Sequence, residues 1–174
     1  MTTPKNVLLQ SVTATDLDLF ENNGRSEEQT GTHQWFGFTS LNSVRRRFAE
    51  NGLLDSDGGV LSVVADDTTV GRVEWFKGAW GRSETSWCWT IAIAVYLEHR
   101  GNGIGTEAQR QLTEYLFRHT RAERIQAYTD VENIGEQRAL EKAGFTKEGT
   151  LRSAQWRDGG WHDQVLFSVV RPSS

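Results

Sequence analysis

The feature that most constrains the fold is a junction at residues 91–106, where an apolar run passes through a glycine-rich turn into an amphipathic segment. Residues 91–95 are apolar and β-like, and Gly101, Gly103 and Gly105 follow them at alternate positions. Glycine leaves backbone N–H groups accessible to an anion, and the positive end of a helix dipole adds to the attraction. The junction therefore predicts a strand, a turn and a helix that bind a diphosphate.

The spacing Arg100-x-x-Gly103-x-Gly105 separates this turn from two common phosphate-binding motifs. The dinucleotide fingerprint needs a third glycine, and a P-loop ends in Lys-Ser or Lys-Thr; this chain has neither at the required place. The spacing thus disfavours nucleotide hydrolysis and dinucleotide-dependent dehydrogenation. A glycine-rich turn that holds no ligand is the alternative.

Hydrophobic periodicity places this turn within a larger unit. After it, apolar residues recur on one helical face, at Ile104, Ala108, Leu112, Tyr115 and Leu116. An alternating, β-branched run over 124–131 follows and predicts a second strand. Strand, helix and strand in this order indicate a parallel β-α-β unit.

Local signals define the flanking elements. Asn133 is expected to cap a second short helix, with Glu136 in the capping-box position and Gly144 after its last turn. Asp158-Gly159 predicts a hairpin turn. The other expected elements are helices at 14–20 and 40–52, a polar, mobile connection over 22–32, a strand pair at 60–65 and 70–76, and a last strand at 164–170.

From about Cys88 to Val170 the chain resembles the GNAT superfamily of acyl-coenzyme A-dependent N-acyltransferases, and within it the branch of ribosomal-protein N-terminal acetyltransferases. The motifs that carry the resemblance are Arg100-x-x-Gly103-x-Gly105, then Asn133 with Lys142-Ala143-Gly144-Phe145, then Glu148-Gly149-x-Leu151-Arg152 leading to Asp158-Gly159 and Asp163. Before Gly71 only the general layout agrees. The resemblance implies an α+β fold in one domain, residues 1–174, with a coenzyme-binding core over about 88–150.

The same resemblance implies a mixed central sheet, flanked by helices, that splays between two parallel strands and admits the pantetheine arm of acetyl-coenzyme A. A backbone N–H at Val95 is expected to face the acyl oxygen as negative charge develops. The residues implied in coenzyme binding are Val95, Arg100, Gly101, Asn102, Gly103, Ile104, Gly105, Thr106 and Asn133. Purely structural roles, as a helix cap for Asn133 and a solvated charge for Arg100, are the alternatives.

The reaction implied is direct attack of a neutral amine on the thioester. Glu74 is the first candidate for the base and Asp130 the second, although each carboxylate is also explained as a surface residue. In many relatives a tyrosine protonates the departing thiolate, and Leu140 stands at that position here. Either Tyr128 or Tyr96 donates the proton instead, or the thiolate leaves without an assigned donor. In the Rim-like branch a serine near the thiol occupies the position that Glu136 occupies here. A capping role is the better explanation of Glu136 at this position.

Composition restricts the function classes further. The net charge of −4 over 174 residues argues against nucleic acid as the main partner. One cysteine, Cys88, excludes an internal disulfide, and the histidines lack paired metal-ligand spacing, so we expect no metal. Neither a membrane span nor a signal peptide is recognisable, so we expect a cytoplasmic protein.

The acceptor is expected to be a small-molecule or peptide amine. Aromatic residues in the segments that shape this pocket in the family are Trp35, Phe36, Trp75, Trp80 and Trp87, beside His33, although core packing explains each tryptophan separately. The last strand is expected to allow pairing in a homodimer. A non-catalytic acyl-coenzyme A sensor and an interaction module without a ligand remain alternative functions.

Overall fold

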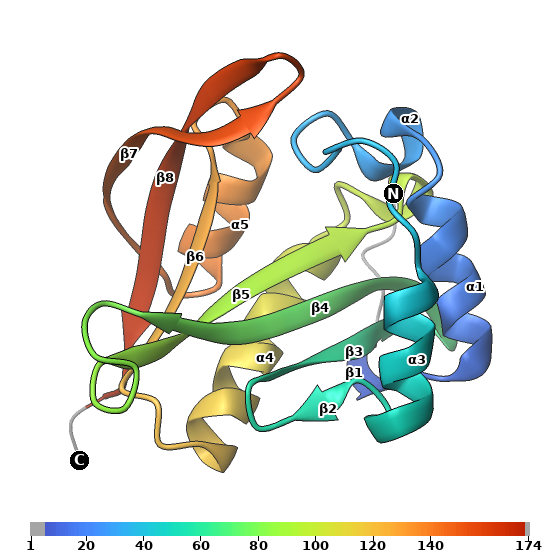
Figure 1. The fold of residues 1–174 in the computed structure, drawn as a ribbon, viewed down its shortest axis with the longest axis horizontal. Helices are drawn as coiled ribbons and strands as arrows, with labels where there is room; N and C mark the ends of the chain where they lie inside the picture. The colour runs from blue at the N-terminus through green and yellow to red at the C-terminus, as the bar shows by residue number, and fades with distance from the viewer. Residues whose placement is uncertain (1–5, 173–174) are drawn as a thin grey trace.

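A mixed eight-stranded sheet organises the chain, which the computed structural model describes from residue 6 to residue 172 (Figure 1). The strands are β1 (Val7–Ser11), β2 (Leu54–Asp55), β3 (Gly58–Ala65), β4 (Thr68–Ala79), β5 (Trp87–Val95), β6 (Arg124–Asp130), β7 (Thr146–Arg157) and β8 (Gly160–Val170). The helices are α1 (Ala14–Asn23), α2 (Glu27–Thr30), α3 (Asn42–Asn51), α4 (Ile104–His119) and α5 (Ile134–Lys142), with a 3-10 turn η1 (Leu97–His99). The strand order is β1-β3-β4-β5-β6-β8-β7, with β2 beside β3.

The predicted β-α-β unit is present as β5, α4 and β6, and β5 and β6 are the parallel pair. The two strands are paired only at their first residues, through Trp89 with Ile125 and Thr90 with Gln126. Beyond Thr90 they separate, and Figure 1 shows β5 diverging from β6 towards the upper edge of the sheet. The predicted splay between two parallel strands is confirmed.

Two hydrophobic clusters hold the helices to opposite faces of this sheet. The larger cluster joins α4 to the strands through fully buried side chains that include Ala108, Leu112 and Leu116. The smaller cluster packs α1 against the other face, with Leu17 and Phe20 buried. Alternate residues of a strand point to opposite faces of the sheet. On β4, Val73 therefore belongs to the larger cluster on the α4 face, while Arg72 lies above the Phe20 ring on the α1 face.

The segment between the first two predicted helices is more ordered in secondary structure than the sequence suggested. The mobile connection expected over 22–32 contains α2, whose N-cap Ser26 accepts a hydrogen bond from the Gln29 N–H at 3.4 Å. The predicted helix at 40–52 is α3, and the predicted helix at 14–20 is α1 with a complete capping box between Thr13 and Asp16. Strand β1 was not predicted.

The last strand is not an edge strand. The predicted hairpin turn is confirmed, with Asp158 and Gly159 at φ +48° and +73° between β7 and β8. Strand β8 then pairs with β6 on one side and β7 on the other. The expectation that the last strand pairs across a dimer is therefore wrong, because both of its hydrogen-bonding edges are used within the chain.

No helix among residues 6–172 has the length and hydropathy needed to cross a membrane.

Candidate functional site

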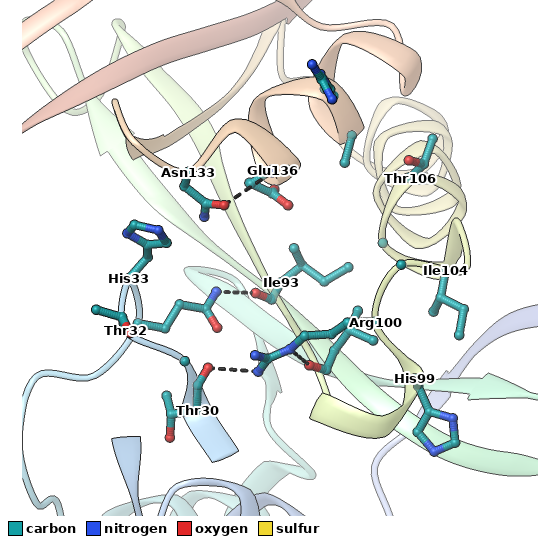
Figure 2. Close-up of a pocket in the computed structure, with 18 of the residues that line it drawn as sticks. Thr30, Thr32, His33, Ile93, His99, Arg100, Ile104, Thr106, Asn133 and Glu136 are labelled. Atoms are coloured by element: carbon teal, nitrogen blue, oxygen red, sulfur yellow. Dashed lines mark hydrogen bonds between the residues drawn. The ribbon is translucent and has the colours of Figure 1, made fainter. Parts of the chain in front are cut away.

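A cavity of about 850 Å³ opens where β5 and β6 separate. Its walls come from four parts of the chain, which are residues 27–34 around α2, residues 93–95 of β5, the turn from η1 into α4, and α5. Figure 2 shows these segments arranged around a common space, with Asn133 and Glu136 on one side of it and Arg100 on the other. The cavity therefore lies at the junction singled out by the sequence.

Two of the three predicted glycines are required by the backbone of this turn. Gly101 and Gly103 have φ values of +78° and +76°, and a Cβ at either position would meet nothing within 4 Å. Gly105 is different, because its backbone is helical and a Cβ there would lie 3.9 Å from both Ile93 Cδ1 and Val95 Cγ2. The first two glycines thus shape the turn, while the third leaves space at the cavity wall.

The N-terminus of α4 presents backbone donors at the cavity. Its N-cap is Gly103, which has no side chain to accept a hydrogen bond, and the first intrahelical bond comes from the N–H of Glu107. The N–H groups of Ile104, Gly105 and Thr106 therefore have no helical partner. The Ile104 side chain is buried in the core, so only its backbone is available to a ligand. Three such donors at the positive end of a helix dipole are an arrangement suited to binding an anion.

Strand β5 presents a second row of backbone groups to the gap. The Tyr96 N–H donates to the Val70 carbonyl of β4 at 2.9 Å, so Val95 and Ile93, by alternation, direct their backbone groups away from β4. Their carbonyls accept hydrogen bonds from two side chains on the side of the gap. Gln34 Nε2 donates to the Ile93 carbonyl at 2.6 Å, and Arg100 Nε donates to the Val95 carbonyl at 2.8 Å. The two carbonyls of this edge are therefore engaged by side chains, whereas the backbone N–H groups of Ile93 and Val95 face the gap and are placed to donate to an extended ligand.

Arg100 lies beside the predicted anion site with its guanidinium directed at protein carbonyls. Besides Val95, its Nη2 donates to the carbonyls of Gln29 and Thr30, each at 2.9 Å (Figure 2). Burial lowers the pKa of the Arg100 guanidinium. Asn102 shapes the same turn, because its Nδ2 donates to the carbonyls of His99 and Arg100. Both side chains hold the turn, and their contact with coenzyme remains a prediction.

The opposite wall begins at the N-terminus of α5. Asn133 Oδ1 accepts a hydrogen bond from the Glu136 N–H at 3.3 Å, and its Nδ2 donates to Thr129 Oγ1 at 3.0 Å. The predicted cap is confirmed. The capping box is not, because the Asn133 N–H donates to the Asp130 carbonyl and the Glu136 side chain turns into the cavity instead.

The three predicted catalytic side chains do not line this cavity. Glu74 pairs with Arg72 through Oε1 at 2.6 Å, on the face of β4 that carries α1. Asp130 is fully buried, with Oδ1 accepting from the Glu132 N–H and Oδ2 from Arg157 Nη2 at 2.5 Å. Tyr128 is exposed on the same face of β6 as Asp130.

Sequence reasoning missed Arg157, which links the sheet to the loop after α2. Besides Asp130, it donates through Nη2 to His162 Nδ1 at 3.0 Å and through Nη1 to the Thr32 carbonyl at 3.1 Å. A smaller cavity of about 290 Å³ lies at this place, with aromatic walls from Trp35, Phe36 and Trp156 and with carboxylates from Glu27 and Asp158. Nothing in the turn-like sequence around Arg157 marks it as a buried side chain.

The predicted aromatic residues divide between the second cavity and the rest of the molecule. Trp35 and Phe36 line the second cavity, and His33 lines the first. The other three, Trp75, Trp80 and Trp87, line neither; Trp75 is buried against α4, Trp80 donates to Gln126 Oε1, and Trp87 packs on Trp89. The buried Cys88 fills space, and burial raises the pKa of its thiol.

Comparison with known proteins gives a consistent result. The family model described as acetyltransferase (GNAT) domain matches residues 6–146. The chain is 29% identical to the probable N-acetyltransferase YjcK of Bacillus subtilis over 181 residues, covering 97% of this chain and 96% of the relative.

Solved structures share the fold. The spermidine N-acetyltransferase of Vibrio cholerae, in complex with coenzyme A and spermine, has a TM-score of 0.76 at 19% identity and covers 94% of this chain and 95% of that chain. RimL, a ribosomal L7/L12 α-N-protein acetyltransferase in complex with coenzyme A, has a TM-score of 0.76 at 15% identity and covers 97% and 96%. Because the family model spans most of the sequence, the chain belongs to the GNAT family of acetyltransferases, which take their acetyl group from acetyl-coenzyme A.

Proposed function

We propose that the protein transfers the acetyl group of acetyl-coenzyme A to a primary amine of a small molecule or peptide, by direct attack within a ternary complex. The observation that carries the proposal is the N-terminus of α4, where three N–H groups without a helical partner meet the cavity beside the separated strands. When bound, the coenzyme supplies an activated thioester, and no covalent enzyme intermediate is needed.

In this proposal the residues of the chain bind and orient the coenzyme chiefly through the backbone. The N–H groups of residues 104–106 hold the diphosphate, with Gly101 and Gly103 setting the path of the turn. The gap-facing edge of β5 bonds the pantetheine arm, and the Val95 N–H polarises the acyl oxygen. Asn133 contacts the arm from the opposite wall while it caps α5.

The second cavity supports a route for the acceptor amine. It shares Glu27 and Thr32 with the coenzyme cavity, so the two spaces adjoin. Exposed rings of Phe36 and Trp156, together with the carboxylates of Glu27 and Asp158, favour a cationic acceptor. The structural relative crystallised with spermine is consistent with such an acceptor.

Glu74 remains our first candidate for the group that receives the amine proton. One of its carboxylate oxygens, Oε1, is engaged by Arg72, which leaves Oε2 unengaged by Arg72. Because Glu74 lines neither cavity, it would receive the amine proton only through a water or an acceptor that reaches its face of β4. Asp130 is the second candidate, and to act it would have to leave its buried pair with Arg157. Tyr128 is a candidate for a different role, the donation of a proton to the departing thiolate. It would act in this way only if the acceptor or coenzyme reaches the exposed face of β6.

The test is to incubate the protein with acetyl-coenzyme A and a panel of amines, including polyamines, amino acids, amino sugars and peptides with free N-termini. We expect thiol release and a product one acetyl group heavier, detected by mass spectrometry. Binding of acetyl-coenzyme A without thiol release for any amine would favour the non-catalytic sensor. A melting temperature that acetyl-coenzyme A does not raise would favour an interaction module.

A further inference from the structure

Glu136 is a half-buried carboxyl group in the wall of the coenzyme cavity. It lies on the first turn of α5, and Figure 2 shows its side chain directed towards Ile93 across the cavity. Among residues 6–172 its carboxyl group forms no ion pair. Its backbone N–H donates to Asn133 Oδ1. The other titratable side chains that line the cavity are Glu27, Glu28, His33, His99, Arg100, Arg138 and Lys142.

The protein environment favours the protonated form of this group. Burial raises the pKa of Glu136 to about 7, and only the amide of the neighbouring Gln109 opposes the effect. Gln109 is itself 1% exposed, and its Nε2 has no hydrogen-bond partner in the described part of the chain. The two side chains come from α4 and α5, which pack together here.

The tyrosine hydroxyl groups of Tyr96 and Tyr128, the expected proton donors, lie outside this cavity. Leu140, one turn after Glu136, is fully buried in the main hydrophobic cluster. Tyr96 belongs to the second cluster on the other side of the sheet, and burial raises its pKa to about 12. Tyr128 does not line the cavity. In the wall of the cavity, Glu136 is a carboxyl group whose pKa, raised to about 7, suits proton donation to a departing thiolate.

We propose that the Glu136 carboxylic acid donates its proton to the departing sulfur. This inference rests on the proposed acetyl transfer. The amine nitrogen forms a bond to the acetyl carbon, the carbon–sulfur bond breaks, and its electron pair goes to sulfur. Sulfur then takes the Glu136 proton, and the carboxylate recovers a proton from solvent through the open cavity. The proton lost by the amine passes to the base on the acceptor side.

Glu136→Gln tests the role, because glutamine keeps the size and hydrogen bonding of the side chain but has no acidic proton. We expect kcat to fall by about a hundredfold, the usual scale for general acid catalysis, with the KM and Kd for acetyl-coenzyme A within threefold of wild type. The wild-type kcat should also decline as the pH rises above about 7, because Glu136 then loses its proton, and this decline should be absent in the variant. Glu136→Asp should recover part of the rate.

Glu141→Gln is the matched control, because Glu141 lies on the exposed side of the same helix and outside the cavity. It should keep the wild-type rate and pH profile. A Glu136→Gln variant with an unchanged kcat, or one that keeps the alkaline decline, would overturn the inference while leaving acetyl transfer intact. A wild-type protein that binds acetyl-coenzyme A and releases thiol to no amine, and not even to water, would overturn both this inference and the proposed function.

Discussion

The Arg100 side chain donates from Nε to the carbonyl of Val95 at 2.8 Å, so a residue of the turn before α4 bonds the strand that borders the gap between β5 and β6. Its Nη2 reaches the last turn of α2 through Gln29 and Thr30. One side chain therefore joins three walls of the cavity. This arrangement suggests that Arg100 contributes to coenzyme binding mainly by holding the walls in place.

Replacing Arg100 should weaken folding more than coenzyme binding. Arg100→Ala removes three hydrogen bonds from a charged donor, and bonds of this kind contribute about 1.5 to 3 kcal/mol each when buried, less when partly solvated. We expect a loss of a few kcal/mol in the free energy of unfolding, measured with urea. The Kd for acetyl-coenzyme A at low temperature should change by less than about tenfold, or about 1.4 kcal/mol. A much larger loss of affinity in a fully folded variant would show direct contact with the coenzyme.

Gly103 and Gly105 should respond differently to the same small change. Gly103→Ala forces a Cβ onto a residue at φ +76° and should cost about 1 kcal/mol or more of stability. Gly105→Ala should gain up to about 1 kcal/mol, because alanine favours the helix. The new methyl group at residue 105 enters the cavity wall, so calorimetry should show weaker acetyl-coenzyme A binding. Unchanged affinity in Gly105→Ala would place the coenzyme elsewhere.

The buried pair of Asp130 and Arg157 should be important for stability. Asp130→Asn leaves the guanidinium, 3% exposed, without its counter-charge, and breaking such a pair costs about 3 to 5 kcal/mol. Asp18→Asn is a suitable control, since it removes an exposed pair with Arg45 worth about 1 kcal/mol or less. Urea unfolding of both variants tests the difference. Equal losses in the two would contradict the assigned burial.

Stability should depend on pH through Glu148. Arg124, and then Ser168, lower the pKa of this carboxyl from 4.5 to about 2. A carboxyl whose pKa is lowered in the folded protein stabilises the fold at pH values above its pKa in the unfolded chain. This stabilisation is lost as the pH falls towards its pKa in the folded protein. Glu148→Gln should therefore be less stable than wild type at pH 7, and the difference should shrink between about pH 4.5 and pH 2. A difference that is constant over this range would contradict the assignment.

Much of the fold follows from local signals in the sequence. The β-α-β unit, the cap at Asn133 and the turn at Asp158-Gly159 were all predicted, because periodicity, a capping side chain and turn residues act over short distances. Helix α2 was missed, since a four-residue polar helix has no periodicity to detect. The position of β8 between β6 and β7 was missed because strand order depends on contacts far apart in the chain.

The site was predictable where the backbone forms it and less so where side chains do. The glycine spacing located the cavity, because positive φ values and an uncapped helix are properties of the local chain. Sequence gave no indication that Arg157 would be buried against Asp130, or that Glu136 would turn away from its expected cap into the cavity. Those outcomes depend on loops and helices packed together from distant segments.

The most direct test of the account follows the backbone amides by NMR while acetyl-coenzyme A is added. If the α4 N-terminus binds the diphosphate, the amide signals of Ile104, Gly105 and Thr106 should show the largest shifts, together with those of Ile93 and Val95 on the gap-facing edge of β5. Saturable binding that shifts other amides and leaves these five unmoved would contradict the central claim.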